Sequence, residues 1–316
     1  MNNLTLKLPS FAKINWNLRI LGKRPDGYHE LVTVLQTVTL HDDLTIQRGE
    51  DDRFLLTCDD PEIPTDRTNL IHRAAMLVQE RLQRPLGASI HLTKRIPTKA
   101  GLGGASSNAA IALLGLCQLW RAELDGTAIM ELGSRLGADV PFFFSGGCAI
   151  GEGIGTTITS KPDSPKQPLI IVTPNASVST AMAYNALKAG SLTTSDSISI
   201  LSSSFEGPVS GNFAQWPLHN DFEGVIFEIE PEIERAKVAL LEAGARGALL
   251  AGSGSSVFGT FDSEPARERA LKNLKCEAGW RVFPCDTLSR DEYFRAMDSS
   301  GFPLLRSLNL QSDTGA

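Results

Sequence analysis

The sequence predicts a protein that mixes helices and strands in two domains. Residues 11–21 alternate apolar and polar side chains as a strand does, whereas residues 68–82 repeat apolar side chains at helical spacing. The chain has 316 residues, which is more than one average domain needs. KPDSPKQP at residues 161–168 is charged and proline-rich, so we place the domain boundary there.

The composition restricts the possible function classes. Hydrophobic residues make up 42% and charged residues 21%, as is usual for a globular protein. A net charge of −6 argues against a general nucleic-acid binder, which needs a basic face. No apolar stretch is long enough to cross a bilayer, and the first residues do not resemble a secretory signal. The five scattered cysteines favour free thiols. We therefore expect a cytoplasmic protein with no nucleic-acid or membrane partner.

The first predicted strand carries an unusual polar face. In FAKINWNLRIL (11–21) the even positions are apolar, while Lys13, Asn15 and Asn17 share the other face of a half-buried strand. A solvated face would be the ordinary explanation, but asparagine is a poor strand former. We interpret this face as one that meets a polar ligand. GKRPDGYHE (22–30) predicts a turn, and 31–40 the return strand.

The other elements follow from the same two periodicities. Strands are predicted at 41–47, 53–59, 88–97, 169–174 and 280–286 and on both sides of a loop within 248–261, and helices at 68–82, 106–120, 127–137, 230–245 and 265–275. Thr68 or Asn69 caps the first helix, a Ser or Asn begins the second, and Gly137 closes the third. Residues 190–217 indicate a long surface loop with one or two short helices. The polar tail beyond about residue 290 is expected to be loosely held.

A run of small residues, KAGLGGASSNAA (99–110), lies between a predicted strand and a predicted helix. It lacks the GxxxxGK[ST] pattern of a P-loop, and Ser106 replaces the third glycine of the GxGxxG dinucleotide pattern. Glycines still let a backbone approach an anion, and a helix N-terminus offers free N–H groups. We therefore predict an anion-binding loop. AGSGSSVFG (251–259) is a similar loop that either meets the first around one phosphate chain or lets another backbone pass closely.

Asp139 lies where apolar packing is expected. It follows a predicted helix end and precedes the apolar run Val140 to Phe144. A simple turn aspartate is one explanation. The other is a catalytic carboxylate whose pKa is held low by a lysine, for which Lys13 is the candidate.

Together these stretches resemble the GHMP kinases, a family named for galactokinase, homoserine kinase, mevalonate kinase and phosphomevalonate kinase. PTKAGLGGASSNAA resembles the central phosphate-binding motif of that family, and AGSGSSVFG its C-terminal glycine motif. FAKINWNLRILGKRPDGYHEL, LGADVPFFFSGGCAIGEGIG and PNASVSTAMAY are similar to one branch, which phosphorylates a tertiary hydroxyl of a cytidyl-diphosphate methylerythritol in the non-mevalonate isoprenoid pathway. The resemblance spans residues 11 to about 259. It implies an ATP-dependent small-molecule kinase that uses Mg²⁺.

The resemblance also implies the fold. It would be an α+β, two-domain GHMP kinase fold with the active-site cleft between the domains. Residues 1–163 would form an N-terminal domain like ribosomal protein S5 domain 2, and residues 164–316 a ferredoxin-like C-terminal domain with the loosely held tail. The oligomeric state, monomer or homodimer, is left open.

Residue roles follow from the same resemblance. Lys13 and Asp139 match the catalytic pair, in which Asp139 takes or orients the proton of the substrate hydroxyl and Lys13 keeps Asp139 ionised. ATP would be bound by Pro97, Thr98, Lys99, Ala100, Gly101, Leu102, Gly103, Gly104, Ala105, Ser106 and Ser107, and by Gly252, Ser253, Gly254 and Ser255. The substrate would be contacted by Asn15, by Tyr28 stacking on the cytosine, by His29 reading its edge, by Tyr184 on its opposite face and by Thr180. Ser106, Ser107 and Glu152 are candidates for Mg²⁺.

Two residues depart from the family pattern, and three other functions are alternatives. Ala105 replaces a third consecutive glycine, which a negative φ would tolerate, and Lys99 stands where a small residue is common.

The chain could instead be a homoserine or mevalonate type of kinase, although the aromatic pair Tyr28 and Tyr184 argues against a small acid as substrate. It could also be a nucleotide-dependent binding protein without catalysis, which the presence of both Lys13 and Asp139 disfavours. A dinucleotide oxidoreductase is the third alternative.

Overall fold

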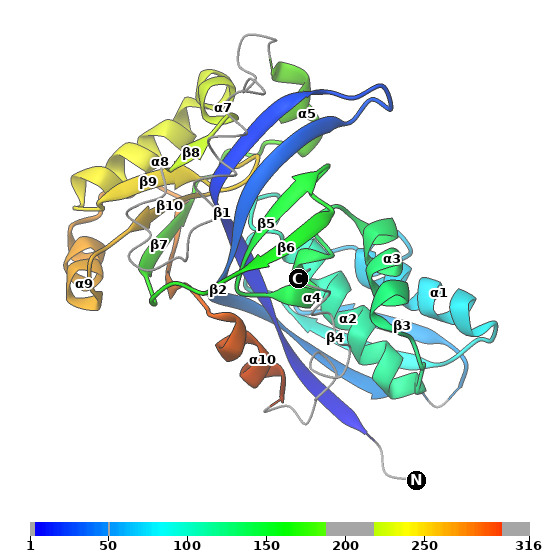
Figure 1. Ribbon diagram of the computed structural model, residues 1–316. Helices are drawn as coiled ribbons and strands as arrows, with labels where there is room; N and C mark the ends of the chain where they lie inside the picture. Colours follow the sequence, from blue (N-terminus) through cyan, green and yellow to red (C-terminus); the bar gives the residue numbers. More distant parts are fainter. Residues whose placement is uncertain (1–3, 50, 188–217, 299–316) are drawn as a thin grey trace.

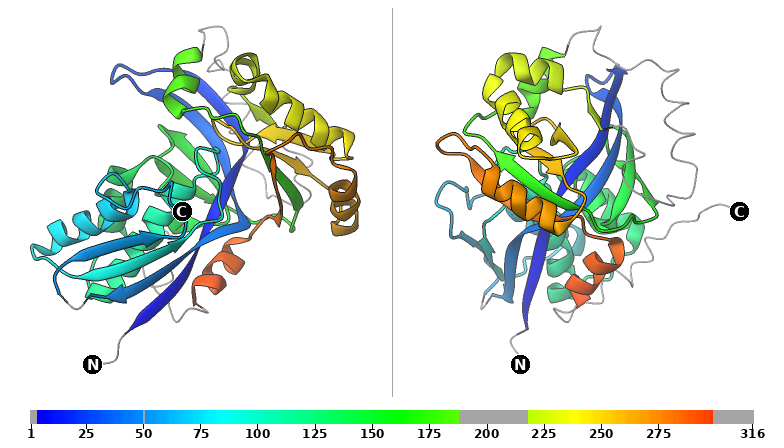
Figure 2. Two further views of the ribbon diagram at one scale, coloured as in Figure 1. Left: turned by 180° about the vertical axis from the view of Figure 1, so that it is seen from behind. Right: turned by 90° about the vertical axis from the view of Figure 1, so that its left-hand side faces the viewer.

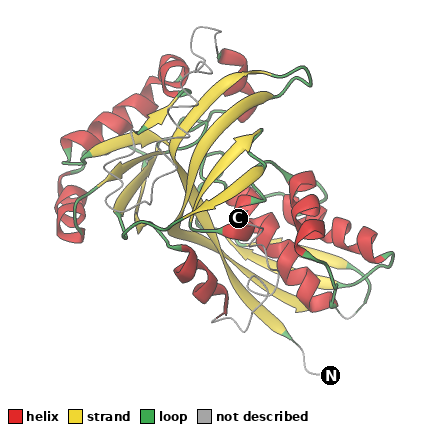
Figure 3. Cartoon of the chain, viewed as in Figure 1, coloured by secondary structure: helices red, strands yellow, loops and turns green. Residues whose placement is uncertain are grey.

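The computed structural model describes residues 4–49, 51–187 and 218–298, which form two sheets with helices on their outer faces (Figure 1, Figure 3). The larger sheet contains β1 (Thr5–Lys23), β2 (His29–Arg48), β3 (Phe54–Cys58), β4 (Ala88–Thr93), β5 (Cys148–Gly153), β6 (Thr157–Lys161) and β8 (His219–Asn220). Its main path runs β3-β4-β2-β1-β8, while β5 pairs with both β2 and β6. The predicted α+β class is confirmed.

The smaller sheet is antiparallel and lies beside the upper half of β1 and β2 (Figure 1). It has the order β11-β7-β10-β9, formed by β7 (Pro168–Thr173), β9 (Gly247–Leu250), β10 (Val257–Thr260) and β11 (Arg281–Asp286). The chain therefore changes sheets after β6, close to the proline-rich stretch. The residue at which the two domains divide stays a prediction.

Helices cover the sheets on opposite sides of the molecule (Figure 2). The larger sheet carries α1 (Leu70–Leu82), α2 (Gly104–Trp120), α3 (Gly126–Leu136) and the one-turn α4 (Phe142–Ser145). The other helices are α5 (Thr180–Ala186), α7 (Glu223–Ile229), α8 (Pro231–Glu242), α9 (Glu264–Asn273) and α10 (Arg290–Asp298). Asn69 caps α1 by accepting the N–H of Ile71, and Gly137 closes α3, as the sequence predicts. Within the described residues, every helix is too short or too polar to cross a bilayer.

The long strand β1 is buried on both faces from Ser10 to Leu18, not half-buried as its alternation predicts. Its apolar face packs against the smaller sheet, where Ile14 and Trp16 share a cluster with Phe258. Its polar side chains are covered because they bond to one another and line a cleft. A register shift lies between Asn15 and Asn17, so Asn17 does not line that cleft with its neighbours.

Helix α2 begins two residues earlier than predicted, at Gly104, and its N-cap is Gly103 in a left-handed conformation. Neither Ser107 nor Asn108 caps it. Both are buried, with Ser107 accepting from the Ser10 hydroxyl at 2.7 Å and Asn108 donating to Asp42 at 2.9 Å. The helix start therefore carries no side-chain cap, which leaves its first N–H groups without a capping acceptor.

The start of the C-terminal tail is docked rather than loosely held. Residues 290–298 form α10, which lies against β1 (Figure 1). Tyr293 is fully buried, and its hydroxyl donates to the Phe143 carbonyl at 2.6 Å. Only two side chains of this nine-residue helix are buried, Tyr293 and Met297, so the sequence pattern carried too little signal. Residues 299–316 and the predicted loop at 190–217 lie outside the described residues.

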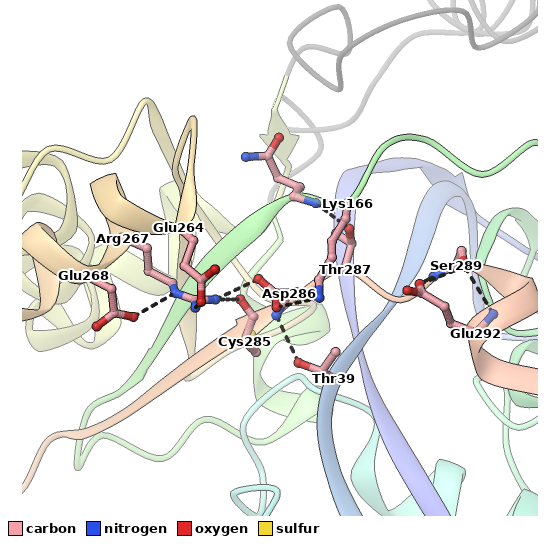
Figure 4. A network of polar contacts seen from close by, with 11 residues as sticks. Thr39, Lys166, Glu264, Arg267, Glu268, Cys285, Asp286, Thr287, Ser289 and Glu292 are labelled. Carbon is pink, nitrogen blue, oxygen red and sulfur yellow. Dashed lines mark hydrogen bonds and ion pairs between the residues drawn. The ribbon is translucent and has the colours of Figure 1, made fainter. Parts of the chain in front are cut away.

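A polar network joins the two sheets at the end of β11 (Figure 4). Arg267 of α9 donates to the Cys285 carbonyl and to Asp286 at 2.7 Å, and Lys166 lies 3.1 Å from the other Asp286 oxygen. The Asp286 N–H in turn donates to the Thr39 hydroxyl of β2 at 3.0 Å. None of the residues in this polar network lines the cleft described below.

Candidate active site

A cleft of about 990 Å³ lies between the two halves of the chain. Its walls come from β1, β2 and the loop before α2 on one side, and from residues 178–185, Phe222 and the loop at 252–254 on the other. Most of the residues that the sequence predicts for ATP, substrate and catalysis line it: Lys13, Asn15, Tyr28, His29, Pro97 to Ser106, Asp139, Thr180, Tyr184 and Gly252 to Gly254.

The glycines of the first loop are required by close neighbours. Gly101 has φ +75°, and a Cβ there would lie only 1.8 Å from the Ala251 carbonyl oxygen. Gly103 has φ +70°, and its Cβ would meet Phe143 at 2.9 Å and Lys13 at 3.0 Å. Both positions combine a left-handed backbone with a close approach, so any side chain would displace the loop.

The second glycine loop is the neighbour that approaches Gly101. The N–H groups of Ser255 and Ser256 donate to the carbonyls of Lys99 and Ala100, at 3.4 and 3.2 Å. The two small-residue loops, which lie about 150 residues apart in the sequence, therefore meet. The close passage of one backbone by the other is therefore confirmed, and both loops face the cleft. Their meeting around one phosphate chain stays a prediction.

Ala105 and Lys99 fit the loop by different means. Ala105 lies inside α2, where its backbone is helical and its side chain is exposed, so the missing glycine removes nothing that this conformation needs. Lys99 instead has φ +51°, a left-handed backbone that is uncommon outside glycine. Its side chain is exposed and lines the cleft.

Lys13 and Asp139 face each other at the bottom of the cleft. The Lys13 ammonium lies 3.7 Å from Asp139 Oδ2, and the two side chains are 5% and 40% exposed. Asp139 stands on a short turn whose next residues, Val140 and Phe142 to Phe144, are buried in the core of the larger sheet. The carboxylate is thus held by an apolar anchor while it stays open to the cleft.

A chain of hydrogen bonds fixes the lysine. Lys13 donates to Asn15 Oδ1 at 2.8 Å, and Asn15 Nδ2 donates to the Thr33 hydroxyl at 2.7 Å. Thr33 donates onward to the Asn17 carbonyl at 2.7 Å. The Lys13 backbone N–H also donates to the Leu102 carbonyl at 3.0 Å, which ties β1 to the first glycine loop. The ammonium therefore has one preferred position between the loop and Asp139.

Aromatic side chains gather at the other end of the cleft. His29 stacks on Tyr184 with ring centroids 4.9 Å apart, and Phe222 meets Tyr184 edge-on at 5.0 Å. Burial, helped by the nearby Asp139 charge, raises the pKa of Tyr184 to about 12, so its phenol stays neutral. Burial, together with the Lys23 charge, lowers the pKa of His29 below 6.5. Tyr28 stands at the hairpin tip, 62% exposed.

Three predicted candidates do not line the cleft. Ser107 is buried against Ser10, and Ser255 is buried with its N–H directed to Lys99. Glu152 is exposed on β5. Thr180 and Ser253, which the sequence assigns to different ligands, lie together with their hydroxyls 3.2 Å apart. Within the described ranges no cluster of three acidic, histidine or cysteine side chains could hold a metal ion.

Sequence reasoning missed several residues that shape the cleft. Lys94 and Asn69 line it, although Asn69 was interpreted only as a helix cap. Phe222 lines it from a segment that carried no periodic signal. Asn220 supports it from behind by donating to the carbonyls of Leu250 and Gly252, at 2.9 and 2.7 Å. No local pattern marks Asn220, because the glycine loop that it contacts lies about 30 residues later in the sequence.

Comparison with family models and known proteins agrees with this geometry. Residues 69–147 match the model of the GHMP kinases N terminal domain, and residues 211–279 match that of the GHMP kinases C terminal. A protein of Citrifermentans bemidjiense named 4-diphosphocytidyl-2-C-methyl-D-erythritol kinase is 40% identical over 280 residues, which cover 89% of this chain and 97% of that protein. A protein of the same name from Caldicellulosiruptor bescii is 38% identical and covers 85% and 94%.

Solved structures extend the comparison to the fold. A crystal structure of 4-(cytidine 5'-diphospho)-2C-methyl-D-erythritol kinase superimposes with a TM-score of 0.74 at 33% identity, covering 89% of this chain and 99% of that one. The mevalonate kinase of L. major has a TM-score of 0.69 at 17% identity, covering 91% and 97%, which is a likeness of fold alone. Because both domain models and near-full-length relatives match it, this chain belongs to the GHMP kinase family, among its 4-diphosphocytidyl-2-C-methyl-D-erythritol kinases.

Proposed function

We propose that this chain uses ATP to phosphorylate the tertiary 2-hydroxyl of 4-diphosphocytidyl-2-C-methyl-D-erythritol, in the non-mevalonate route to isoprenoid precursors. The observation that carries this proposal is the position of the Lys13–Asp139 pair. It lies in one cleft with two touching glycine loops and an aromatic group. ATP bound at the glycine loops and a cytosine-containing substrate bound at the aromatic group can therefore both reach the Asp139 carboxylate.

The glycine loops and the start of α2 bind the ATP phosphates. Their backbones approach closely because side chains are absent at Gly101 and Gly103, and the uncapped end of α2 adds N–H groups and the positive end of its dipole. Phosphoryl transfer needs mainly alignment and neutralisation of the negative charge that spreads over the transferred group. Gly252 to Gly254 complete the site from the opposite wall.

Asp139 acts on the acceptor hydroxyl. It accepts the hydroxyl proton while the hydroxyl oxygen forms its bond to the γ-phosphorus, and the bond from that phosphorus to the β-γ bridging oxygen breaks, which releases ADP. Lys13 keeps Asp139 ionised and stabilises charge on the reacting oxygens. Asn15 and Thr33 keep the lysine in place for this role.

The aromatic end of the cleft binds the cytosine. Tyr28 and Tyr184 offer ring faces for stacking, and Thr180 supplies a nearby hydroxyl. Because the pKa of His29 is lowered, its imidazole is neutral at pH 7 and presents one N–H donor and one nitrogen acceptor. Cytosine presents both donor and acceptor groups along its edge, so a neutral histidine matches it.

Mg²⁺ fits the oxygen donors that face the phosphate loop. The ion prefers oxygen ligands and takes one or two protein groups beside substrate phosphates. Of the three candidates that the sequence offers for this ion, only Ser106 lines the cleft. We propose its hydroxyl as a protein ligand. The bound ion would neutralise charge on the β- and γ-phosphates.

We place the reaction in the cytoplasm. All five cysteines are free, and the pKa values of the buried Cys117 and Cys148 thiols are raised to about 12 by burial, which makes both thiols inert.

The test is ADP release from Mg-ATP with the cytidyl-diphosphate substrate, measured for the wild type beside Asp139→Ala. Homoserine and mevalonate serve as control acceptors. If only the cytidyl substrate is turned over, and Asp139→Ala abolishes this turnover, the result supports the proposed substrate, the kinase reaction and the role of Asp139. Turnover with a control acceptor overturns the substrate assignment. Absence of turnover with every acceptor overturns the kinase proposal and favours a binding protein.

A further inference from the structure

Asp42 of β2 is a fully buried carboxylate that the chemistry proposed above does not use. It does not line the cleft, yet it accepts hydrogen bonds from four donor groups. The backbone N–H groups of Arg95 and Ile96 both donate to Oδ1 at 2.7 Å. Asn108 Nδ2 donates to Oδ2 at 2.9 Å, and the Lys94 ammonium lies 2.9 Å from the same oxygen.

All these donors come from the two ends of the first glycine loop. Arg95 and Ile96 directly precede Pro97, where the loop begins, and Lys94 additionally donates to the Ile96 carbonyl. Asn108 lies in α2, immediately after the loop. One carboxylate on a rigid central strand therefore holds both ends of residues 97–107.

The chemistry of the contacts requires a carboxylate. Every partner of Asp42 is a donor, and an ionised carboxylate is the only common side chain that offers acceptors alone on both atoms. An amide at this position would turn its NH₂ toward the Asn108 amide and the Lys94 ammonium, which are donors as well. A buried charge is tolerated here because the Lys94 ammonium and three N–H groups compensate it.

The loop needs such support from outside. Residues 97–103, which precede α2, include left-handed residues at Lys99, Gly101 and Gly103, so this part of the loop lacks the repeating hydrogen bonds that hold a helix or strand. We propose that Asp42 is a positioning residue, which keeps the loop in the shape that binds the ATP phosphates. This inference rests on the proposed function, in that it takes residues 97–107 as the ATP loop.

Asp42→Asn tests the proposal, with Asp43→Asn as the matched control. Asp43 is the next residue on β2 and forms an ion pair with the Arg95 side chain, but it is half-exposed. The control therefore makes the same change of charge beside the same segment without touching the buried cluster. The double variant Asp42→Asn with Asn108→Asp reverses donor and acceptor between the two side chains and restores their hydrogen bond.

Two measurements separate positioning from general stability. In Asp42→Asn we expect amide hydrogen exchange at residues 95–107 to become about tenfold faster, with unchanged exchange in the smaller sheet. We expect the KM for ATP to rise about tenfold and the KM for the cytidyl substrate to stay within about twofold. The double variant should recover most of both losses, and Asp43→Asn should match the wild type.

Unchanged loop exchange in Asp42→Asn, or equal rises in both KM values, overturns the proposal. So does a double variant that is no better than the single one. If Asp42→Asn does not fold, the double variant is compared with Asp43→Asn instead. A double variant that folds and shows wild-type hydrogen exchange in the loop supports the proposal, because it differs from the unfolded single variant by the restored hydrogen bond between residues 42 and 108. If the wild type shows no turnover, the proposed function fails, while loop exchange still tests Asp42.

Discussion

The two ends of the cleft differ in how firmly their residues are held. At the phosphate end, Lys13 is nearly buried and hydrogen-bonded, and the two glycine loops touch. At the base end, Tyr28 stands exposed on a hairpin turn whose ion pairs, Arg24 with Asp26 and Glu30, lie on the surface and contribute little. The end where bonds change is preorganised, which lowers the cost of alignment during the reaction. In the proposed function, the exposed Tyr28 side of the base end is free to adjust to the bound cytosine, whereas Tyr184 is held by Phe222.

The largest expected effect is at the rigid end. Asp139→Asn should lower kcat by about 10²- to 10⁴-fold, because the hydroxyl proton loses its acceptor. The KM values and the unfolding midpoint should change little, since Asp139 is 40% exposed and the apolar run behind it is untouched. Steady-state kinetics and urea unfolding check both points. Glu152→Gln, an exposed carboxylate outside the cleft, is the control, and a loss of kcat under tenfold would contradict the role of Asp139.

The contact between the glycine loops gives the next effect. Gly101→Ala places a Cβ 1.8 Å from the Ala251 carbonyl oxygen in a left-handed backbone, so the loops must separate. We expect a loss of about 1–3 kcal/mol in the free energy of unfolding and a raised KM for ATP. Gly224→Ala is the matched control, because nothing lies within 4 Å of its Cβ and it stands in helix α7, where alanine stabilises by about 0.5–1 kcal/mol. Urea unfolding of both variants should give changes of opposite sign.

The base end should respond in binding alone. Tyr28→Ala removes a stacking face worth about 1–3 kcal/mol to a bound base, so the KM for the cytidyl substrate should rise about tenfold. The unfolding midpoint and the KM for ATP should stay unchanged, because Tyr28 is 62% exposed. Tyr28→Phe keeps the ring and should behave as the wild type. A lower unfolding midpoint in Tyr28→Ala would contradict the proposal that the base end of the cleft contributes to binding and not to stability.

The sequence predicts the parts of this molecule whose pattern is local. The helix at 70–82 and its Asn69 cap, the strand pairing of β1 with β2, and a glycine loop before α2 all follow from periodicity and glycine content. Asp42 and Asp43 are neighbours on a strand and point to opposite faces, so the sequence alone does not say which is buried. The short strand β8 and Phe222 are placed by partners distant in the sequence, which no local pattern reports.

The smallest effect that we predict is a pH dependence at the base end. Burial and the Lys23 charge disfavour protonation of His29, so its pKa lies below the ordinary 6.5. The neutral ring keeps both a donor and an acceptor for cytosine, whereas the protonated ring has only donors. The KM for the cytidyl substrate should therefore be flat from pH 8 down to about 6.5 and rise only at lower pH. The KM for ATP should not follow it.

Lys23→Met sharpens that prediction, because it removes the positive charge that helps to lower the pKa of His29. In this variant the pKa of His29 rises toward its ordinary value, and the increase in the substrate KM should begin at a higher pH than in the wild type. His29→Gln, which keeps a donor and an acceptor without titrating, should give a flat profile. A wild-type KM that already rises above pH 6.5, or a profile that Lys23→Met leaves in place, would mean that His29 does not read the base edge in its neutral form. The adjustable end of the cleft would then recognise the base by stacking alone.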